Sequence, residues 1–358
     1  MSVIGVPTLL GPVLGPVIGG VIVDNFSWRW IFFVNLPVGL VALALAARVL
    51  PRVDVSRARP PLDLQGLLLL SPGLAALVYG LSEVGMQGTV VDWRVVIGLG
   101  AGAVLLGLWG RHAVRAAGRS LIDLGLFRDR AFAAAAGTTF VFGVSLFGAM
   151  LILPLYYQIV RQESALSAGL LLAPQGLGAA VAMPIAGRIT DRVGAGKIVP
   201  WGVLVALVGT GVYTQLTAST SFLLLGVALW VRGVGLGMTM MPAMAAAYQT
   251  LDRAAVPRAT SAINIIRTVG GSIGTAVLTV VLQRQIVAHI PGATGEIGTL
   301  PGGVAFVAEP LAEAFGATFW WAVGLTALAL VPAFFLPRRP PMAAAAQRSL
   351  SSSAPARP

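Results

Sequence analysis

Cysteine is absent from this 358-residue sequence, which excludes a disulfide framework, a thiol nucleophile and a cysteine-ligated metal. The apolar segments of the chain also contain no cluster of acids, no Ser/His dyad and no set of metal ligands. We therefore expect no catalytic residues and no metal site, so the protein is not expected to be an enzyme. No Gly-x-x-x-x-Gly-Lys-Ser/Thr loop occurs either, which argues against an ATP-driven pump.

Charged residues are scarce, at 10% of the chain, whereas soluble proteins carry about 25%. With 57% hydrophobic residues and a mean hydropathy of +0.87, the composition is not that of a soluble protein. The net charge of +11 would suggest a nucleic-acid partner if the basic residues formed one patch, but they are spread along the chain. We expect them to contact anionic lipid headgroups, and we expect no nucleic-acid partner.

Ten apolar runs are long enough to cross a bilayer, which takes about 20 helical residues. Because backbone groups in lipid must be hydrogen-bonded internally, each run is predicted to be a helix. The predicted fold class is therefore all-α, a polytopic membrane protein. A short interfacial helix is predicted within 120–127, and a long outer loop at 285–313. The predicted spans are 3–23, 31–50, 64–83, 94–112, 131–157, 166–187, 198–216, 222–248, 259–283 and 314–337.

Lysine and arginine are distributed unevenly between the loops. Of the 24 such residues, 18 lie in the second, fourth, sixth and eighth loops or in the C-terminal tail, and only four lie in the other loops. Since cytoplasmic loops carry the basic excess, both termini are predicted to be cytoplasmic. We expect a multi-pass protein of the plasma membrane, with the lipid bilayer as a partner.

The first predicted span is rich in glycine and proline, which allow close helix approach and bend helices. A tight packing face explains most such runs. However, this run, followed by Asp24 and the segment 28–39 (WRWIFFVNLPVG), resembles the antiporter motif and the fifth-to-sixth helix turn of the fourteen-helix drug:proton antiporter family of the major facilitator superfamily. The motif positions are Gly11, Gly15, Pro16, Gly19 and Gly20.

A second motif, predicted in a short cytoplasmic loop after the sixth span, resembles that superfamily's Gly-x-x-x-Asp-Arg-x-Gly loop motif. Its acid can face a helix N-terminus, and its arginines can pair with acidic partners. Two interpretations remain open: a conformational latch, or a basic turn that only sets the topology. The residues are Gly187, Arg188, Asp191, Arg192 and Gly194.

Three polar residues lie inside predicted spans: Arg232, Asn264 and Arg267. By resemblance, Arg232 begins a second-half copy of the superfamily's fourth-helix Arg-x-x-x-Gly pattern, and the other two belong to a degenerate copy of the glycine-rich fifth helix. An arginine within a membrane is costly and suggests function. Each arginine, however, lies within about two turns of a span end, so snorkelling to the interface is the alternative.

Several side chains are candidates for contact with a substrate. Flexible thioethers suit promiscuous apolar binding, and tyrosine and glutamine side chains could orient a drug-like amphiphile. The alternatives are core packing for the methionines and interfacial anchoring for the other residues. The candidates are Tyr156, Tyr157, Gln158, Gln175, Met238 and Met241.

The resemblance runs from the first span to Pro337, and 63–66 (DLQG) opens a helix as the family's seventh helix does. It assigns 1–50 to a remnant of the N-terminal domain (family helices five and six) and 51–130 to two linker helices and a cytoplasmic loop. It also assigns 131–337 to a six-helix C-terminal domain, and the composition of 338–358 predicts a disordered cytoplasmic tail. Family helices one to four have no counterpart, so we expect the chain to be a piece of a longer protein.

The resemblance implies proton-coupled efflux of small, amphiphilic drug-like or antibiotic compounds, driven by a proton gradient and without a cofactor. No acid lies in the middle of a predicted span, so an obvious proton site is missing. Asp24 and Asp63, both at helix ends, come nearest. The alternative is a half-module or membrane scaffold that does not transport on its own and pairs with a separate N-terminal half.

Overall fold

The structure is a computed structural model that describes residues 15, 17–49, 63–87, 92–116, 124–251, 255–293 and 307–338. These parts of the chain are mainly helical, and no β-strand occurs among them. Nine of the described helical segments are long and apolar enough to cross a membrane. The all-α fold class is thereby confirmed, and nine predicted spans have a counterpart. Most of the remaining one, 3–23, lies outside the described residues.

The helices follow one another along the chain with short connections. A helical stretch at 17–25 comes first. The next helices are α2 (Trp30–Phe33), α3 (Asn35–Val49), α4 (Leu64–Gln87), α5 (Trp93–Arg115) and the 3-10 helix η1 (Leu124–Arg128). The rest are α6 (Arg130–Leu155), the π-helical turn η2 (Tyr156–Val160), α7 (Ala165–Val193), α8 (Ala195–Gly211), the 3-10 helix η3 (Val212–Gln215), α9 (Phe222–Gln249), α10 (Val256–His289), α11 (Ala308–Leu328) and α12 (Leu330–Phe334).

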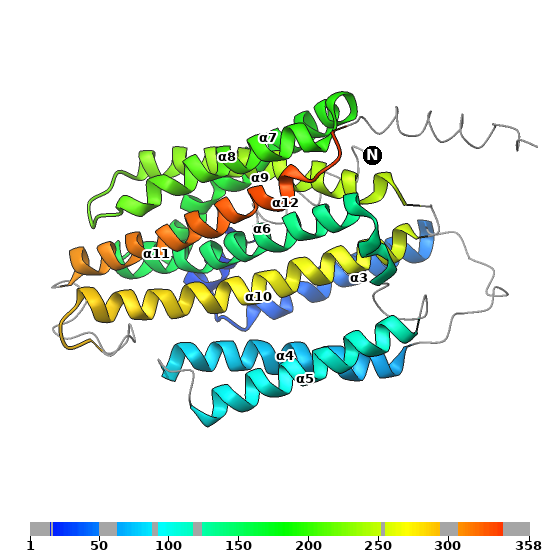
Figure 1. The fold of residues 1–358 in the computed structure, drawn as a ribbon. Helices are drawn as coiled ribbons and strands as arrows, with labels where there is room; N and C mark the ends of the chain where they lie inside the picture. Colours follow the sequence, from blue (N-terminus) through cyan, green and yellow to red (C-terminus); the bar gives the residue numbers. More distant parts are fainter. Residues whose placement is uncertain are drawn as a thin grey trace, which may run out of the picture.

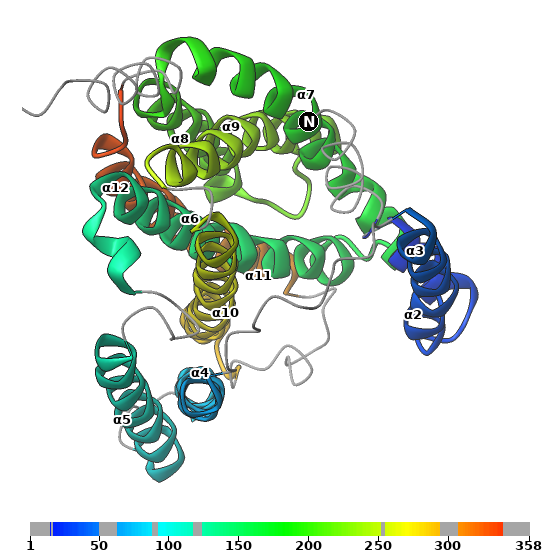
Figure 2. The same cartoon turned by 90° about the vertical axis from the view of Figure 1, so that its right-hand side faces the viewer.

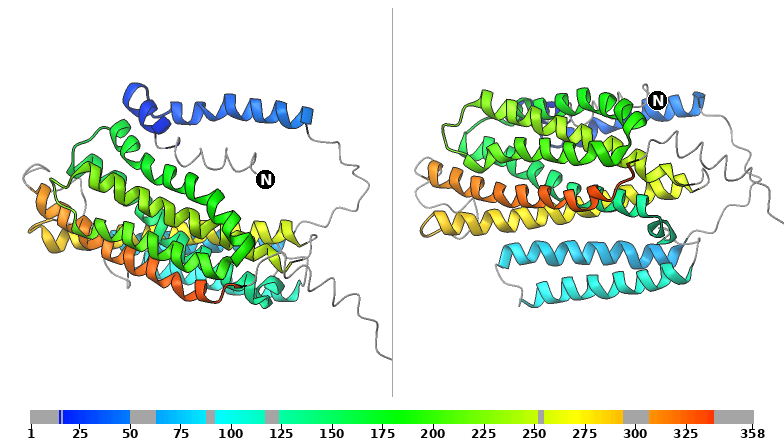
Figure 3. Two further views of the ribbon diagram at one scale, coloured as in Figure 1. Left: turned by 90° about the horizontal axis from the view of Figure 1, so that it is seen from above. Right: turned by 45° about the horizontal axis from the view of Figure 1, so that its top comes forward.

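The long helices lie side by side with roughly parallel axes (Figure 1). Viewed along these axes, α6 to α12 form one bundle, in which α6 packs against α10 and α9 packs between α7 and α8 (Figure 2). The α4–α5 hairpin lies outside this bundle, with α4 beside α10. Helices α2 and α3 lie apart from the hairpin, on another side of the bundle (Figure 3).

Two apolar clusters hold the bundle together, one near each end. The cluster at the predicted cytoplasmic end includes Phe132, Val199 and Ile263. The cluster at the predicted outer end includes Leu229 and Phe315. All five side chains are buried. Because lipid is as apolar as these side chains, the free energy that stabilises the bundle comes from close packing between the helices rather than from the exclusion of water.

Glycines allow several helix backbones to meet. At the α7–α9 contact, a Cβ added to Gly178 or Gly233 would collide with the backbone of the facing helix. Inside the hairpin, a Cβ on Gly98 of α5 would lie 2.7 Å from the Cα of Gly80 on α4. Small residues at such contacts are typical of helix association within membranes.

Helices α2 and α3 contain no buried residue. Apolar side chains are exposed on all sides of α3, for example Leu40 at 66%, Leu43 at 68% and Val49 at 75%. A helix that is apolar all round fits a lipid environment. In the described part of the chain, α2 and α3 together form a membrane-length span, Trp30–Val49, that is not buried against the bundle.

Some predicted helix ends are wrong. Helix α7 runs past its predicted end at 187 to Val193, so the motif predicted in a loop lies mostly on the last turns of a helix. The helix stops at Gly194, whose φ of +87° is readily adopted only by glycine. Helices α10 and α11 both extend into the loop predicted at 285–313. The predicted short helix within 120–127 corresponds to η1, and 120–123 lie outside the described residues.

Candidate functional site

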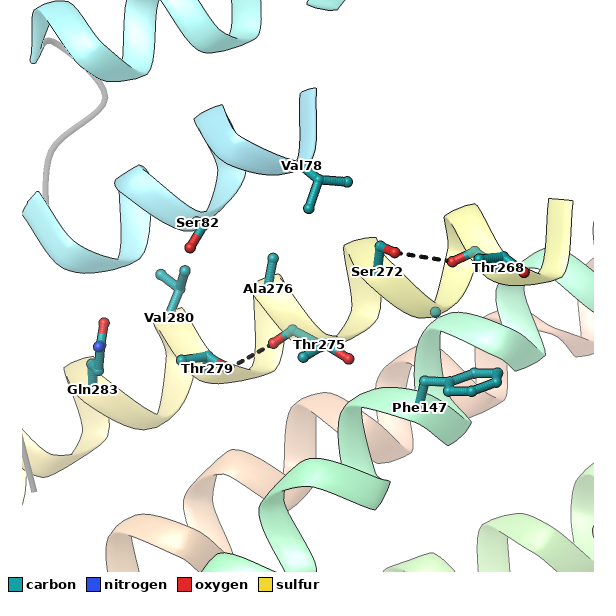
Figure 4. A pocket seen from close by; sticks show the side chains of 11 residues that line it. Val78, Ser82, Phe147, Thr268, Ser272, Thr275, Ala276, Thr279, Val280 and Gln283 are labelled. Carbon is teal, nitrogen blue, oxygen red and sulfur yellow. Dashed lines mark hydrogen bonds between the residues drawn. The ribbon is translucent and has the colours of Figure 1, made fainter. Parts of the chain in front are cut away.

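A cavity of about 500 Å³ lies between α4 and α10 (Figure 4). Cavities that hold small-molecule ligands span about 300–1,000 Å³, so its volume suits a drug-sized compound. Helix α4 contributes Val78 and Ser82, and α6 contributes Phe147. The remaining lining residues come from α10: Thr268, Gly271, Ser272, Thr275, Ala276, Thr279, Val280 and Gln283.

A polar stripe runs along the face of α10 that lines this cavity. Its members recur every three or four residues, which places them on one side of the helix. Polar side chains that face lipid are costly and usually face protein or a cavity instead. Helix α4 lies against part of the stripe, whereas Thr268 at one end of it is exposed. The members are Thr268, Ser272, Thr275, Thr279 and Gln283.

Hydroxyl groups of the stripe donate their hydrogens to their own helix. The Thr268 hydroxyl donates to the Asn264 carbonyl at 2.9 Å. The Ser272 hydroxyl donates to the Thr268 carbonyl at 3.2 Å, and the Thr279 hydroxyl donates to the Thr275 carbonyl at 2.8 Å. Each hydroxyl oxygen also has lone pairs that accept hydrogen bonds. These three hydroxyl groups therefore present acceptors to a ligand.

Gln283 is the lining residue of α10 nearest to the predicted outer end. Its side-chain oxygen is buried and has no hydrogen-bond partner among the described residues, and leaving a buried acceptor unpaired costs free energy. None of the lining residues carries a charge. The cavity can therefore exchange hydrogen bonds with a ligand, but it offers no counter-charge.

A buried arginine lies elsewhere in the bundle, at the α7–α9 contact. Arg232 is 4% exposed, and its Nη1 donates a hydrogen bond of 2.7 Å to Oε1 of Gln175 on α7. Within the described residues, no carboxylate forms an ion pair with it. Arg232 therefore does not snorkel in this structure, whereas Asn264 is exposed and Arg267 is half-buried.

Two of the candidate substrate contacts lie in the outer core. Tyr156 and Tyr157 are fully buried, and the Tyr156 hydroxyl donates to the Thr217 carbonyl at 2.7 Å. The Tyr157 hydroxyl is buried without a partner among the described residues. Gln158, by contrast, is exposed.

The remaining candidates lie at helix–helix contacts. Gln175 accepts the hydrogen bond from the buried arginine. Met238 is half-buried beside Gly202 of α8, and Met241 is 45% exposed, near Gly187 of α7. None of the six candidates lines the α4–α10 cavity. Their contact with a substrate stays a prediction.

The glycines of the antiporter motif differ in their surroundings. Gly15 and Gly19 have open space where a Cβ would be. A Cβ on Gly20, by contrast, would lie 2.6 Å from the carbonyl oxygen of Ala165 at the start of α7. Gly20 is therefore the described motif residue that needs to be small. Gly11 and Pro16 lie outside the described residues.

Asp24 connects the helical stretch 17–25 to the bundle through a hydrogen bond. Its carboxylate accepts a hydrogen bond of 2.8 Å from the Leu166 amide, in the first turn of α7. This bond and the Ser164 hydroxyl hold the pKa of Asp24 below its ordinary value. The stretch 17–25 thus meets the bundle at the N-terminus of α7, where a negative charge is favourable.

The second motif lies at the opposite end of α7. Arg188, Asp191 and Arg192 are exposed on its last two turns, and Gly194 ends the helix. Within the part of the chain that the structure describes, these charged side chains form no ion pair. The structure brings the motif to one helix end, and its role as a latch stays a prediction.

The sequence interpretation missed two features involving acids. Glu83 is only 8% exposed near the end of α4, and it shares a hydrogen bond with Tyr79. Asp63 lies 2.8 Å from His112 Nε2, which joins the start of α4 to the end of α5. An acid within an apolar run could have marked Glu83, but no local pattern reveals a partner 49 residues away.

Comparison with known proteins identifies the same superfamily as the sequence motifs. The family model described as Major Facilitator Superfamily matches residues 1–275. "Multidrug resistance protein B homolog" of Mycobacterium tuberculosis (strain ATCC 25618 / H37Rv) is 40% identical over 361 residues, covering 95% of this chain and 67% of the relative. "Lincomycin resistance protein LmrB" of Listeria monocytogenes is 30% identical over 300 residues, covering 82% and 62%. "Uncharacterized MFS-type transporter YcnB" of Bacillus subtilis is 33% identical over 286 residues, covering 80% and 60%.

These comparisons confirm the resemblance that the motifs indicated. The chain spans about two thirds of the length of the curated relatives that it matches.

Proposed function

Because this chain belongs to the Major Facilitator Superfamily, a family of membrane transporters, we propose that it takes part in proton-coupled efflux of small amphiphilic, drug-like compounds across the cell membrane. The observation that carries the proposal is the drug-sized cavity between two membrane-length helices, lined by uncharged polar groups. The names of two relatives, which refer to resistance to multiple drugs and to lincomycin, support this class of cargo.

The proposed division of the chain follows its packing. Helices α6 to α12 serve as the C-terminal domain, and α4 and α5 serve as a linker hairpin beside it. Superfamily transport moves two such domains around a shared site. The exposed end of α7 is a suitable place for contacts that form in one state and break in another.

Proton coupling needs a carboxyl group in a low-dielectric environment whose charge can change. Asp24 does not suit this task, because its lowered pKa keeps it charged until the pH falls through that value, well below neutrality. Glu83 suits it better, since it is 8% exposed within a membrane-length helix. We therefore assign proton binding to Glu83 within this chain.

Everted membrane vesicles that contain the chain test the function. An imposed proton gradient should drive uptake of labelled chloramphenicol, and an ionophore that collapses the gradient should abolish it. Vesicles that take up nothing would contradict transport by this chain alone. Uptake that appears only when additional helices are supplied as a separate polypeptide would favour the half-module.

The Glu83→Gln variant tests the proton site. It should lose at least about tenfold of gradient-driven uptake, because the amide cannot exchange a proton, and it should retain binding of the compound. Glu313→Gln, which changes an exposed acid of α11, is the matched control. Uptake at the wild-type rate in the Glu83 variant would remove this assignment.

The Asp191→Asn variant tests the latch. Loss of the charge should slow uptake several-fold, while the amount of protein inserted in the membrane stays the same. If the uptake rate is unchanged, the motif only sets the topology. Glu163→Gln, in the connection before α7, serves as a control for the removal of one negative charge.

A further inference from the structure

We propose that the α4–α10 cavity binds uncharged amphiphiles that carry hydroxyl or amide hydrogen-bond donors, in preference to cations. The proposal rests on the proposed function, because it names the class of cargo. It concerns a site built by the linker hairpin and α10 together, since Val78 and Ser82 of α4 line the cavity opposite the polar stripe.

The first argument is charge. A cation that enters a site of low dielectric loses its hydration, and it needs a carboxylate or a similar group in return. No lining residue carries a charge. Glu83 follows Ser82 in the chain, but its side chain is not part of the lining and interacts with Tyr79. An uncharged ligand avoids this cost.

The second argument is the direction of the hydrogen bonds. The hydroxyl hydrogens of Thr268, Ser272 and Thr279 already serve carbonyl groups of α10. Their oxygens remain available as acceptors for a ligand. Ligand groups that donate hydrogen bonds complete this set, whereas a ligand without donors would leave the acceptors unpaired.

The third argument is the apolar part of the lining. Val78 and Val280 face the cavity from two helices, and Phe147 lies at its edge on α6. Aromatic and aliphatic side chains usually supply most of the contact in ligand sites, with a few polar groups that fix the orientation. The cavity therefore suits a ligand with one apolar or aromatic part and one part rich in donors.

Equilibrium binding of two labelled probes to the purified full chain in lipid nanodiscs tests the proposal. Chloramphenicol is uncharged and carries two hydroxyl groups, an amide N–H and an aromatic ring. Tetraphenylphosphonium is a permanent cation of aromatic character without donors. The wild-type chain should bind chloramphenicol more tightly than the cation. The absence of chloramphenicol binding, or tighter binding of the cation, overturns the proposal.

The double variant Thr275→Val and Thr279→Val removes two acceptors with little change in shape. It should weaken chloramphenicol binding about tenfold, the effect of losing one or two net hydrogen bonds. Thr260→Val is the matched control, because the Thr260 hydroxyl makes the same intrahelical bond, to the Val256 carbonyl, outside the cavity. Equal affinities of the double variant and the wild type overturn the proposal.

Ser272→Asp provides a second, gain-of-function test that does not depend on loss of binding. A carboxylate in the cavity should raise the affinity for tetraphenylphosphonium several-fold relative to that for chloramphenicol. An unchanged preference overturns the proposal. Gradient-driven uptake is measured separately: variant-sensitive binding without uptake refutes the transport function alone, and uptake with binding that no variant alters refutes this site alone.

Discussion

At the scale of single residues, the buried bond between Arg232 and Gln175 makes an asymmetric prediction. Gln175→Leu leaves a buried guanidinium without its hydrogen-bond acceptor, so it should lower the free energy of unfolding by about 2–3 kcal/mol. Arg232→Met leaves only an uncharged amide unpaired and should cost about 1 kcal/mol. Denaturant titration of the purified protein in detergent measures both values.

The double variant of this pair sharpens the test. If the bond accounts for the cost, the combined loss should be smaller than the sum of the two single losses, because the second change removes the group that the first left unpaired. Gln158→Leu, at an exposed position, should change the free energy by less than about 0.5 kcal/mol. A larger cost for the arginine variant than for the glutamine variant would contradict the argument.

Single residues also show where sequence interpretation reaches its limit. The presence of Arg232 in an apolar run indicated a special position, because a charge in lipid is costly. The sequence left open whether the side chain snorkels or lies inside the bundle. Its partner is 57 residues away, and only the packing of α7 on α9 brings the two together. The polar stripe of α10 was missed, although its spacing was readable as a helical face.

At the scale of elements, the α4–α5 hairpin depends on glycine contacts. In Gly98→Leu, the Cβ would lie 2.7 Å from the Cα of Gly80, so the helices would have to separate. We expect a loss of about 1–3 kcal/mol in stability, measured as a lower midpoint in thermal unfolding. Gly100→Leu, two residues along α5 with nothing within 4 Å of its Cβ, is the matched control. Equal midpoints for the two variants would show that the hairpin does not need this contact.

The helices also show which features of an element the sequence could predict: the position of a span, but not its ends. Apolar length alone located the nine described spans, because the bilayer sets the length of a helix. Their ends were less predictable, because charged residues do not stop a helix. Helix α7 passes through Arg188, Asp191 and Arg192, and it ends only where Gly194 adopts a positive φ. The fold class followed from hydropathy, whereas the ends depend on local backbone geometry.

At the scale of the whole molecule, the arrangement of the helices could not be read from the sequence. Apolar runs indicate that each helix lies in the membrane, but they do not say which helices are neighbours. The contact between α4 and α10 joins segments that nearly 200 residues separate, and it creates the cavity. The resemblance assigned both helices a position in the family order, which stays a prediction, but it did not place the hairpin against the bundle.

The orientation of the whole chain is the last prediction. The basic excess places the start of α8 in the cytoplasm and the α8–α9 connection outside. Because the sequence has no cysteine, single-cysteine variants need no background correction. A membrane-impermeant maleimide should label Ser219→Cys in intact cells, and it should label Lys197→Cys only after permeabilisation. Both positions are exposed. The reverse pattern would place the arginine-rich loops outside and would also reverse the direction in which the proposed transporter moves its cargo.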